Sequence, residues 1–254
     1  SANKTPRARG VFFLCSWYAR AMTAKLSVVA TPIGNLKDIS ERALSTLRKC
    51  DVVLCEDTRV TKKLLSHYEI QKPVISYHSH SGFAKNDKVF SLLQEGKHLA
   101  LVSDAGSPTV SDPGAMLVCE VRQHFRNEVI IETIPGPSAV TAALSICGLP
   151  ADSYVFLGFP PHKKGRKTFF DKLSKFKETT VFFESPHRFM KTLSALKDVL
   201  DKSRTVAVCR ELTKLHEEVQ TGHIDEVFDH YSNHLKQCAE SSLLLLVRQK
   251  SVSC

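Results

Sequence analysis

The chain has 254 residues, of which 43% are hydrophobic and 24% are charged. This composition is ordinary for a globular protein and excludes disordered, collagen-like and coiled-coil classes. The longest apolar runs are too short to span a bilayer, so we expect no membrane partner. The formal net charge of +9 favours an anionic partner. Six positive residues precede the first acid, Asp38, which leaves the rest of the chain only mildly basic.

The N-terminal segment, residues 1–25, differs in character from the rest. Its first 21 residues carry arginines but no acid, include the apolar run VFFLCSWY and are followed by Met22. Three interpretations stay open: an organellar transit segment, a secretory signal, or an upstream extension before a start at Met22. The apolar run is short for a signal core, so we rank secretion last and prefer the extension.

Apolar strand-like runs alternate with amphipathic helical stretches from residue 26 onward. The first half has expected strands at residues 26–31, 51–57, 73–79, 98–104 and 128–135, and expected helices at residues 38–50, 58–69, 87–96, 114–125 and 138–147. This alternation predicts a mainly parallel sheet covered on both faces. Asp38, with Glu41 three residues later, is expected to begin the first helix as a capping box.

A Gly-Pro-Asp-Ser cluster at residues 148–153 interrupts the alternation, and we place a domain boundary there. We expect an N-terminal α/β domain over residues 26–148 and a C-terminal α/β domain over residues 149–254. The second half has expected strands at residues 154–160, 179–185 and 205–212, and expected helices at residues 167–176, 188–200 and 226–235. The last apolar run, residues 242–250, suits a central strand.

The eight cysteines are scattered and form no CxxC pair, so the spacing of metal ligands is absent. Several lie inside apolar runs, where a reduced thiol behaves as a small core side chain. A reducing compartment follows, and we expect a cytoplasmic protein, or an organellar one if residues 1–21 are a transit segment.

Residues 98–115, HLALVSDAGSPTVSDPGA, are an apolar strand that ends in two aspartates interleaved with glycine and proline. Glycines let backbone approach a ligand closely, although an ordinary turn has the same composition. We expect Asp104, at the carboxyl end of the strand, to contact the ligand. Asp112 is expected to cap the next helix, with Pro113 at its first position.

Six further predicted strands also end in a polar or Gly/Pro-rich segment: ATPIGN, EDTR, IPGPSA, GFPPHKKGRK, ESPHR and RELTK. In open α/β sheets ligands bind beyond the carboxyl ends of strands, so these segments together predict a functional cleft. The basic run HKKGRK contributes Lys163, Lys164, Arg166 and Lys167 as candidates for phosphate contacts, against the alternative of a solvated loop.

Several common chemistries lack their motifs in this chain. No GxG occurs, so the dinucleotide fingerprint is missing, and the Walker loop is missing as well. Neither the nucleophile elbow GxSxG nor the zinc motif HExxH occurs. Backbone-lined loops and carboxylates remain, which suit a ligand with an amine, a ribose and an amino-acid part.

The motifs VVATPIGNLKDISERAL, EDTR, SDAGSPTVSDPG, PGPSA, CGLP, GFPP, ESPHR and RELTK occur in that order. The chain resembles, from about Leu26 to Glu218, the bacterial 16S ribosomal RNA ribose 2′-O-methyltransferases that modify a cytidine. These belong to the tetrapyrrole-methylase-like superfamily of class III methyltransferases. The resemblance implies two α/β domains with a mainly parallel N-terminal and a mixed C-terminal sheet, and a homodimer. After Gly222 the chain departs from the family pattern, since CAESSLLLLV replaces the usual Gly-Glu pair.

The resemblance also implies S-adenosylmethionine in the cleft between the domains, and no metal. The cofactor positions carried over are Pro32, Ile33, Gly34, Asp104, Ser107, Ser138 and Ala139. The segment from Leu157 to Phe159 is expected to add a lid from the second domain. The partner implied is 16S-type rRNA or the small ribosomal subunit.

Ribose methylation needs a base for the 2′-OH proton and an in-line path to the sulfonium methyl. The candidate bases are Glu56, Asp57 and Glu184, with His187 as a further possibility. Arg59 and Arg188 are expected to bind phosphates of the target, against the alternative of structural salt bridges. Two other functions stay open, a tetrapyrrole methylase and an RNA-binding module without catalysis.

Overall fold

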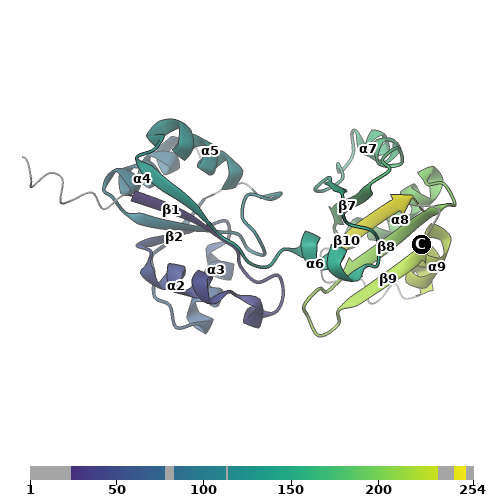
Figure 1. Ribbon diagram of the computed structural model, residues 1–254, viewed down its shortest axis with the longest axis horizontal. Helices are drawn as coiled ribbons and strands as arrows, with labels where there is room; N and C mark the ends of the chain where they lie inside the picture. The colour runs from purple at the N-terminus through teal and green to yellow at the C-terminus, as the bar shows by residue number, and fades with distance from the viewer. Residues whose placement is uncertain (1–23, 78–82, 113, 234–242, 250–254) are drawn as a thin grey trace, which may run out of the picture. The chain divides into compact units, whose positions relative to one another are not determined.

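The computed structural model describes residues 24–77, 83–112, 114–233 and 243–249 (Figure 1). The predicted N-terminal extension up to residue 23 and the predicted role of Pro113 lie outside these residues. The described chain forms two compact units. The first holds the chain up to Val29, Glu41–Asp104 and Pro108–Pro135, and the second holds Ala30–Ser40, Ala105–Ser107 and the chain from Gly136 onward.

The sheet of the first unit is wholly parallel, as expected for strands that alternate with helices. Its order is β3-β2-β4-β1-β5. The strands are β1 (Ala24–Val29), β2 (Val52–Cys55), β3 (Val74–Ser76), β4 (His98–Val102) and β5 (Val129–Ile134). The connections that leave β1 and β4 run in opposite directions across the sheet. The one from β1 crosses β4 to reach β2, and the chain that leaves β4 crosses β1 to reach β5. Ligands bind in open α/β sheets at the carboxyl ends of two neighbouring strands that diverge in this way.

Helices cover both faces of this sheet. Figure 1 shows α4 (Phe83–Gln94) and α5 (Gly114–Phe125) over one face and α2 (Glu41–Lys49) and α3 (Thr58–His67) over the other. On the first face, Leu26, Leu99 and Leu101 pack against α4 and α5. On the other face α2 buries Ala43 and Leu47. The predicted capping box is wrong, because α2 begins at Glu41 and Asp38 lies in a separate 3-10 turn, Leu36–Asp38.

The sheet of the second unit is mixed, with the order β6-β7-β10-β8-β9. Only β6 and β7 are parallel, and the other neighbours are antiparallel. The strands are β6 (Tyr154–Phe156), β7 (Thr179–Glu184), β8 (Arg204–Arg210), β9 (Glu218–His223) and β10 (Leu243–Gln249). The predicted central strand near the end of the chain is confirmed, since β10 lies between β7 and β8. The sequence did not predict β9, because this edge strand, EVQTGH, lacks an apolar alternation.

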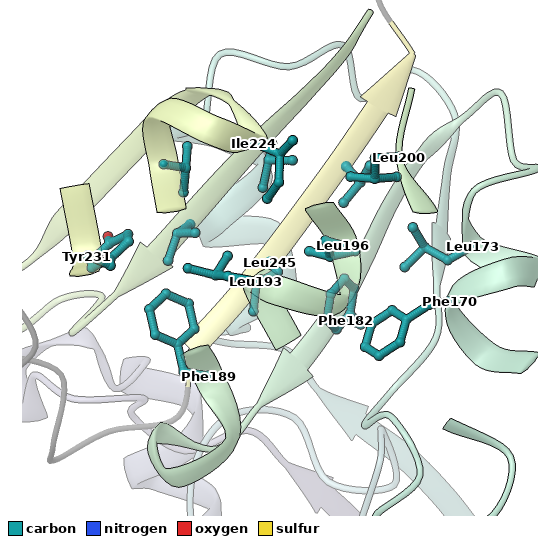
Figure 2. Close-up of a cluster of buried hydrophobic side chains, with 14 residues drawn as sticks. Phe170, Leu173, Phe182, Phe189, Leu193, Leu196, Leu200, Ile224, Tyr231 and Leu245 are labelled. Carbon is teal, nitrogen blue, oxygen red and sulfur yellow. The ribbon is translucent and has the colours of Figure 1, made fainter. Parts of the chain in front are cut away.

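Alternate side chains of this sheet build two cores. On one face Phe182, Val208 and Leu245 pack against α7 (Arg166–Leu173), α8 (Phe189–Val199) and α9 (Ile224–Asn233), as Figure 2 shows in part. On the other face Leu244 and Leu246 pack against α6 (Ala139–Ile146). Helix α6 therefore packs on the second sheet, although it precedes the predicted boundary at residue 148, which stays a prediction. Within the described residues no helix has the length and apolar character to cross a membrane.

Candidate functional site

Three loops of the chain meet in the second unit. They are the loop after β1, the loop after β4 and the loop before α6. Thr31 N–H donates to the carbonyl oxygen of Gly106 at 2.9 Å, and Gly106 N–H donates to that of Thr31 at 3.1 Å. Ser107 Oγ lies 3.5 Å from the carbonyl oxygen of Pro137. The loops are thus joined mainly through their backbones.

Two glycines permit this close approach. Gly106 has φ +84°, and a Cβ at this position would lie 3.3 Å from Ile33 Cγ2. A Cβ on Gly136 would lie 3.0 Å from Ala30 Cβ. Larger residues at either position would push the loops apart. The structure therefore brings together most of the positions predicted to bind the cofactor, namely Pro32, Ile33, Gly34, Ser107, Ser138 and Ala139.

Helix α6 begins at these loops. Its N-cap residue, Ser138, has the extended backbone of a cap, but its side chain makes no capping hydrogen bond. The first backbone N–H groups of a helix have no partner within the helix, and they favour a carboxylate or phosphate. The start of α6 therefore fits the carboxylate of an amino-acid ligand.

The loop after β1 also touches the loop after β8, which carries the RELTK motif. Asn35 N–H donates to Thr213 Oγ1 at 3.0 Å. A Cβ on Gly34 would lie 2.7 Å from Lys214 Cγ and 2.9 Å from the Leu212 carbonyl oxygen, so only glycine fits here. Thr213 has φ +66°, a left-handed conformation that costs a non-glycine residue free energy. The sequence indicated the motif but not this contact.

Asp57 and Asp104 meet in the first unit. Asp57 is the N-cap of α3 and accepts from Arg59 N–H at 2.8 Å, while Arg59 Nη2 lies 2.7 Å from its second oxygen. The hydrogen bonds from Arg59 lower the pKa of Asp57 to about 2. Asp104 Oδ1 accepts from Asp57 N–H at 3.2 Å. The Arg59 side chain is 86% exposed, so this predicted RNA contact stays accessible, and Glu56 is exposed as well.

Asp112 has the helix-capping role that the sequence predicted. Its Oδ1 accepts from the N–H of Gly114, the first residue of α5, at 3.0 Å. Burial raises the pKa of this carboxyl group. Asp112 therefore stabilises the loop after β4, which leaves Asp104 as the aspartate at the carboxyl end of the strand.

Glu184 is fully buried at the end of β7, and four donors contact its carboxylate. Oε2 accepts from Arg166 Nη2 at 2.9 Å and from Thr192 Oγ1 at 2.5 Å. Oε1 accepts from Ser185 N–H at 2.8 Å, and Arg188 Nη2 lies 2.8 Å from it. Thr192 was not predicted, because a threonine within an amphipathic helix looks like ordinary core filling.

The same two arginines hold the loop between β6 and α7. Arg188 Nη1 donates to the carbonyl oxygen of Pro160 at 3.4 Å, and Arg166 Nη1 donates to that of Pro161 at 3.2 Å. Both side chains are 18% exposed. Two guanidinium groups on one carboxylate leave one net positive charge. The Arg188 salt bridge that we held as an alternative is therefore present, and it lies beside further cations.

The rest of the basic run is exposed. Lys163, Lys164 and Lys167 are exposed around the start of α7. Leu157, predicted as part of a lid over the cofactor, is half-buried and packs against the core of the second unit. No cluster of three potential ligands for a metal ion occurs among the described residues.

Comparison with known proteins agrees with this architecture. The model of the tetrapyrrole (corrin/porphyrin) methylase family matches residues 25–227. Among solved structures, uroporphyrin-III C-methyltransferase from Thermus thermophilus has a TM-score of 0.61 at 19% identity, with 89% of this chain and 94% of that chain covered. The methyltransferase CobJ has a TM-score of 0.66 at 14% identity, with 91% and 96% covered. These likenesses show the fold alone.

Curated relatives are much closer in sequence. The ribosomal RNA small subunit methyltransferase I of Mesorhizobium japonicum is 46% identical over 215 residues, which cover 84% of this chain and 72% of the relative. The protein of the same name from Thermotoga maritima is 43% identical over 207 residues, 82% of this chain and 91% of the relative. The chain therefore belongs to the tetrapyrrole (corrin/porphyrin) methylase family and, within it, to the ribosomal RNA small subunit methyltransferase I group.

Proposed function

We propose that the chain transfers the methyl group of S-adenosylmethionine to the ribose 2′-OH of a cytidine in small-subunit rRNA. The observation that carries the proposal is the identity of 40% or more to relatives named small subunit rRNA methyltransferases. The basic residues at the start of α7 and the backbone-lined loops at the end of β1 support it. The cofactor supplies an activated methyl group and a neutral leaving group.

The loops after β1 and β4 and the start of α6 would hold the cofactor. Backbone groups suit its ribose and amino-acid parts, and the N-terminus of α6, at Ser138, suits its carboxylate. Asp104 is a candidate partner for its amine or ribose. The position of the cofactor between the two domains stays a prediction.

The carboxylates divide into two roles. Glu184 is fully buried and four donors contact its oxygens, so a substrate hydroxyl cannot reach it, and we assign it the task of positioning Arg166 and Arg188. We propose that Glu56 or Asp57 accepts the 2′-OH proton. Alignment of the two bound reactants supplies much of the rate, since correct orientation is worth about 7 to 11 kcal/mol.

The cations would bind the RNA backbone. Lys163, Lys164 and Lys167 are exposed for phosphate contacts, and Arg59 is a further candidate. Arg166 and Arg188 add a fixed positive charge beside the lysines. Phosphate contacts of this kind position an RNA without reading its sequence. The homodimer and the cytoplasmic location stay predictions.

The reaction itself provides the first test. We expect the purified protein to bind S-adenosylmethionine in a calorimetric titration and to transfer labelled methyl to small ribosomal subunits that lack the modification. A non-enzymatic RNA-binding module would ignore the cofactor. Methylation of precorrin substrates, with none of ribosomal subunits, would favour the tetrapyrrole methylase instead.

Conservative changes at the carboxylates test proton transfer. Asp57→Asn keeps the oxygen that caps α3, and Glu56→Gln keeps the size of the side chain. We expect at least one of them to lower the methylation rate by about 10²- to 10⁴-fold with normal cofactor binding. The pKa of Asp57 is about 2. If Asp57 is the base, we therefore expect the methylation rate to stay constant as the pH falls from about 8 to about 5.

The matched control for these variants is Asp51→Asn. Asp51 lies immediately before β2, whereas Glu56 and Asp57 follow this strand. The Asp51 carboxylate accepts from His98 N–H at 2.8 Å. We expect this variant to methylate at the wild-type rate. Full activity in both Asp57→Asn and Glu56→Gln would contradict the assignment.

The buried carboxylate is tested by Glu184→Gln. Loss of the charge leaves two half-buried guanidinium groups without their counter-ion, so we expect the free energy of unfolding in urea to fall by about 3 to 5 kcal/mol. Glu178→Gln, at the exposed residue just before β7, should change the free energy of unfolding by less than about 0.5 kcal/mol. Equal stability of the two variants would show that Glu184 does not hold the arginines.

The lysines at the start of α7 are tested through salt dependence. We expect the triple variant Lys163→Gln, Lys164→Gln, Lys167→Gln to bind RNA more weakly and to reduce the slope of log affinity against log salt by about 2 to 3, since each lost phosphate contact removes about 0.7 to 0.9. A matched triple change at Lys172, in the last turn of α7, and at Lys175 and Lys177, which follow the helix, should keep the slope. An unchanged slope in the first variant would support the alternative interpretation, in which these lysines lie in a solvated loop and do not contact RNA.

A further inference from the structure

Phe159 lies in the loop between β6 and α7 and leaves 47% of its surface exposed. Full burial of a phenylalanine side chain is normally worth about 1.5 to 3 kcal/mol, so a ring left half exposed forgoes part of this stabilisation. The ring is also not isolated. It stacks on Phe183 with 5.1 Å between ring centroids and 30° between ring planes. Phe156 and Phe183 form a T-shaped pair with 5.4 Å between ring centroids.

The backbone on both sides of this ring is fixed. The carbonyl oxygen of Gly158 accepts from Phe183 N–H at 2.8 Å. Pro160 and Pro161 give their carbonyl oxygens to Arg188 and Arg166, as described above. The loop carbonyls around Phe159 are therefore tied to the end of β7 and to the two arginines. One face of the ring contacts Phe183, and the fixed loop keeps part of the ring exposed.

Cationic residues hold and follow the loop that carries the ring. Arg166 and Arg188 hold its loop, and Lys163, Lys164 and Lys167 follow it along the chain. A fixed aromatic ring beside several cations is the combination by which proteins bind single-stranded nucleic acid, since the ring stacks on a base and the cations contact phosphates. S-adenosylmethionine carries a positive sulfonium, so the same charges disfavour it.

We propose that Phe159 is a stacking platform for a nucleobase of the RNA substrate, and this inference rests on the proposed rRNA methylation. Arg188 and Arg166 act as positioning residues for the platform through the carbonyl groups that they hold. The base that stacks is the target cytidine or a neighbour in the strand. The competing occupant is the adenine of the cofactor, in the lid role that the family resemblance implied for this segment.

The test compares two probes that carry the same phosphates. One is a single-stranded oligocytidine decamer, and the other is a decamer of the same length with abasic sites in place of the bases. We expect wild-type protein to bind the first about tenfold more tightly, as aromatic stacking on a base is worth about 1 to 3 kcal/mol. Phe159→Leu keeps the apolar contact with Phe183, and we expect it to reduce this ratio to within about twofold, with Phe159→Trp restoring it.

The matched control is Tyr154→Leu. Tyr154 is an aromatic residue with similar exposure, 43%, at the start of β6. We expect Tyr154→Leu to keep the wild-type ratio of affinities for the two decamers. This variant shows whether loss of any exposed aromatic ring has the same effect. Unfolding in urea checks that each variant is folded.

Two outcomes overturn the proposal: an unchanged ratio in Phe159→Leu, or an equal loss of the ratio in Tyr154→Leu. An unchanged ratio combined with weaker binding of S-adenosylmethionine by Phe159→Leu would assign the ring to the cofactor. The methyl-transfer assay on wild-type protein is independent of both outcomes. If the wild-type protein transfers no methyl group but still binds the oligocytidine more tightly than the abasic decamer, the proposed methylation is refuted and the stacking site is retained.

Discussion

The second unit depends on one buried carboxylate, Glu184. An ionised group without solvent requires partners, and Glu184 obtains them from Arg166, Arg188, Thr192 and the backbone that follows it. The two arginines then use their remaining donors on carbonyl groups of the loop before α7. A charge that must be compensated thus fixes the position of this loop. Replacement of the cluster by apolar residues could preserve stability but would remove the fixed cations.

The loops at the end of the parallel sheet are held by a different principle. Their contacts are backbone hydrogen bonds between Thr31 and Gly106, with glycines where a side chain would collide. Such loops present N–H and carbonyl groups rather than charges. This suits a ligand that carries its own positive charge, whereas the loop before α7 suits a polyanion. The chain therefore separates a backbone-lined region from a cationic region.

Most of the fold could be predicted from the sequence, because hydrophobic periodicity records burial. The central position of β10 follows from its unbroken apolar run, and the parallel sheet follows from the alternation of strands and helices. The edge strand β9 could not be predicted in this way, since half-exposed strands lack the pattern. The start of α2 was misplaced because Asp38 and Glu41 have the spacing of a capping box, while a short 3-10 turn intervenes.

The candidate site was predictable where it is continuous in sequence and not where it is made by pairing. Motifs at strand ends indicated the loops and their glycines. They did not indicate that Gly34 would lie against the Leu212 carbonyl oxygen, because these residues are far apart along the chain. They also did not indicate that Thr192 would donate to Glu184, because the two residues lie on different elements. The charged motif ESPHR was ambiguous in the same way, since Glu184 suited a base as well as a counter-ion. The four donors around it favour the second role, because they occupy both oxygens of a carboxylate that is fully buried and therefore closed to a substrate, whereas the Asp57 side chain is partly exposed.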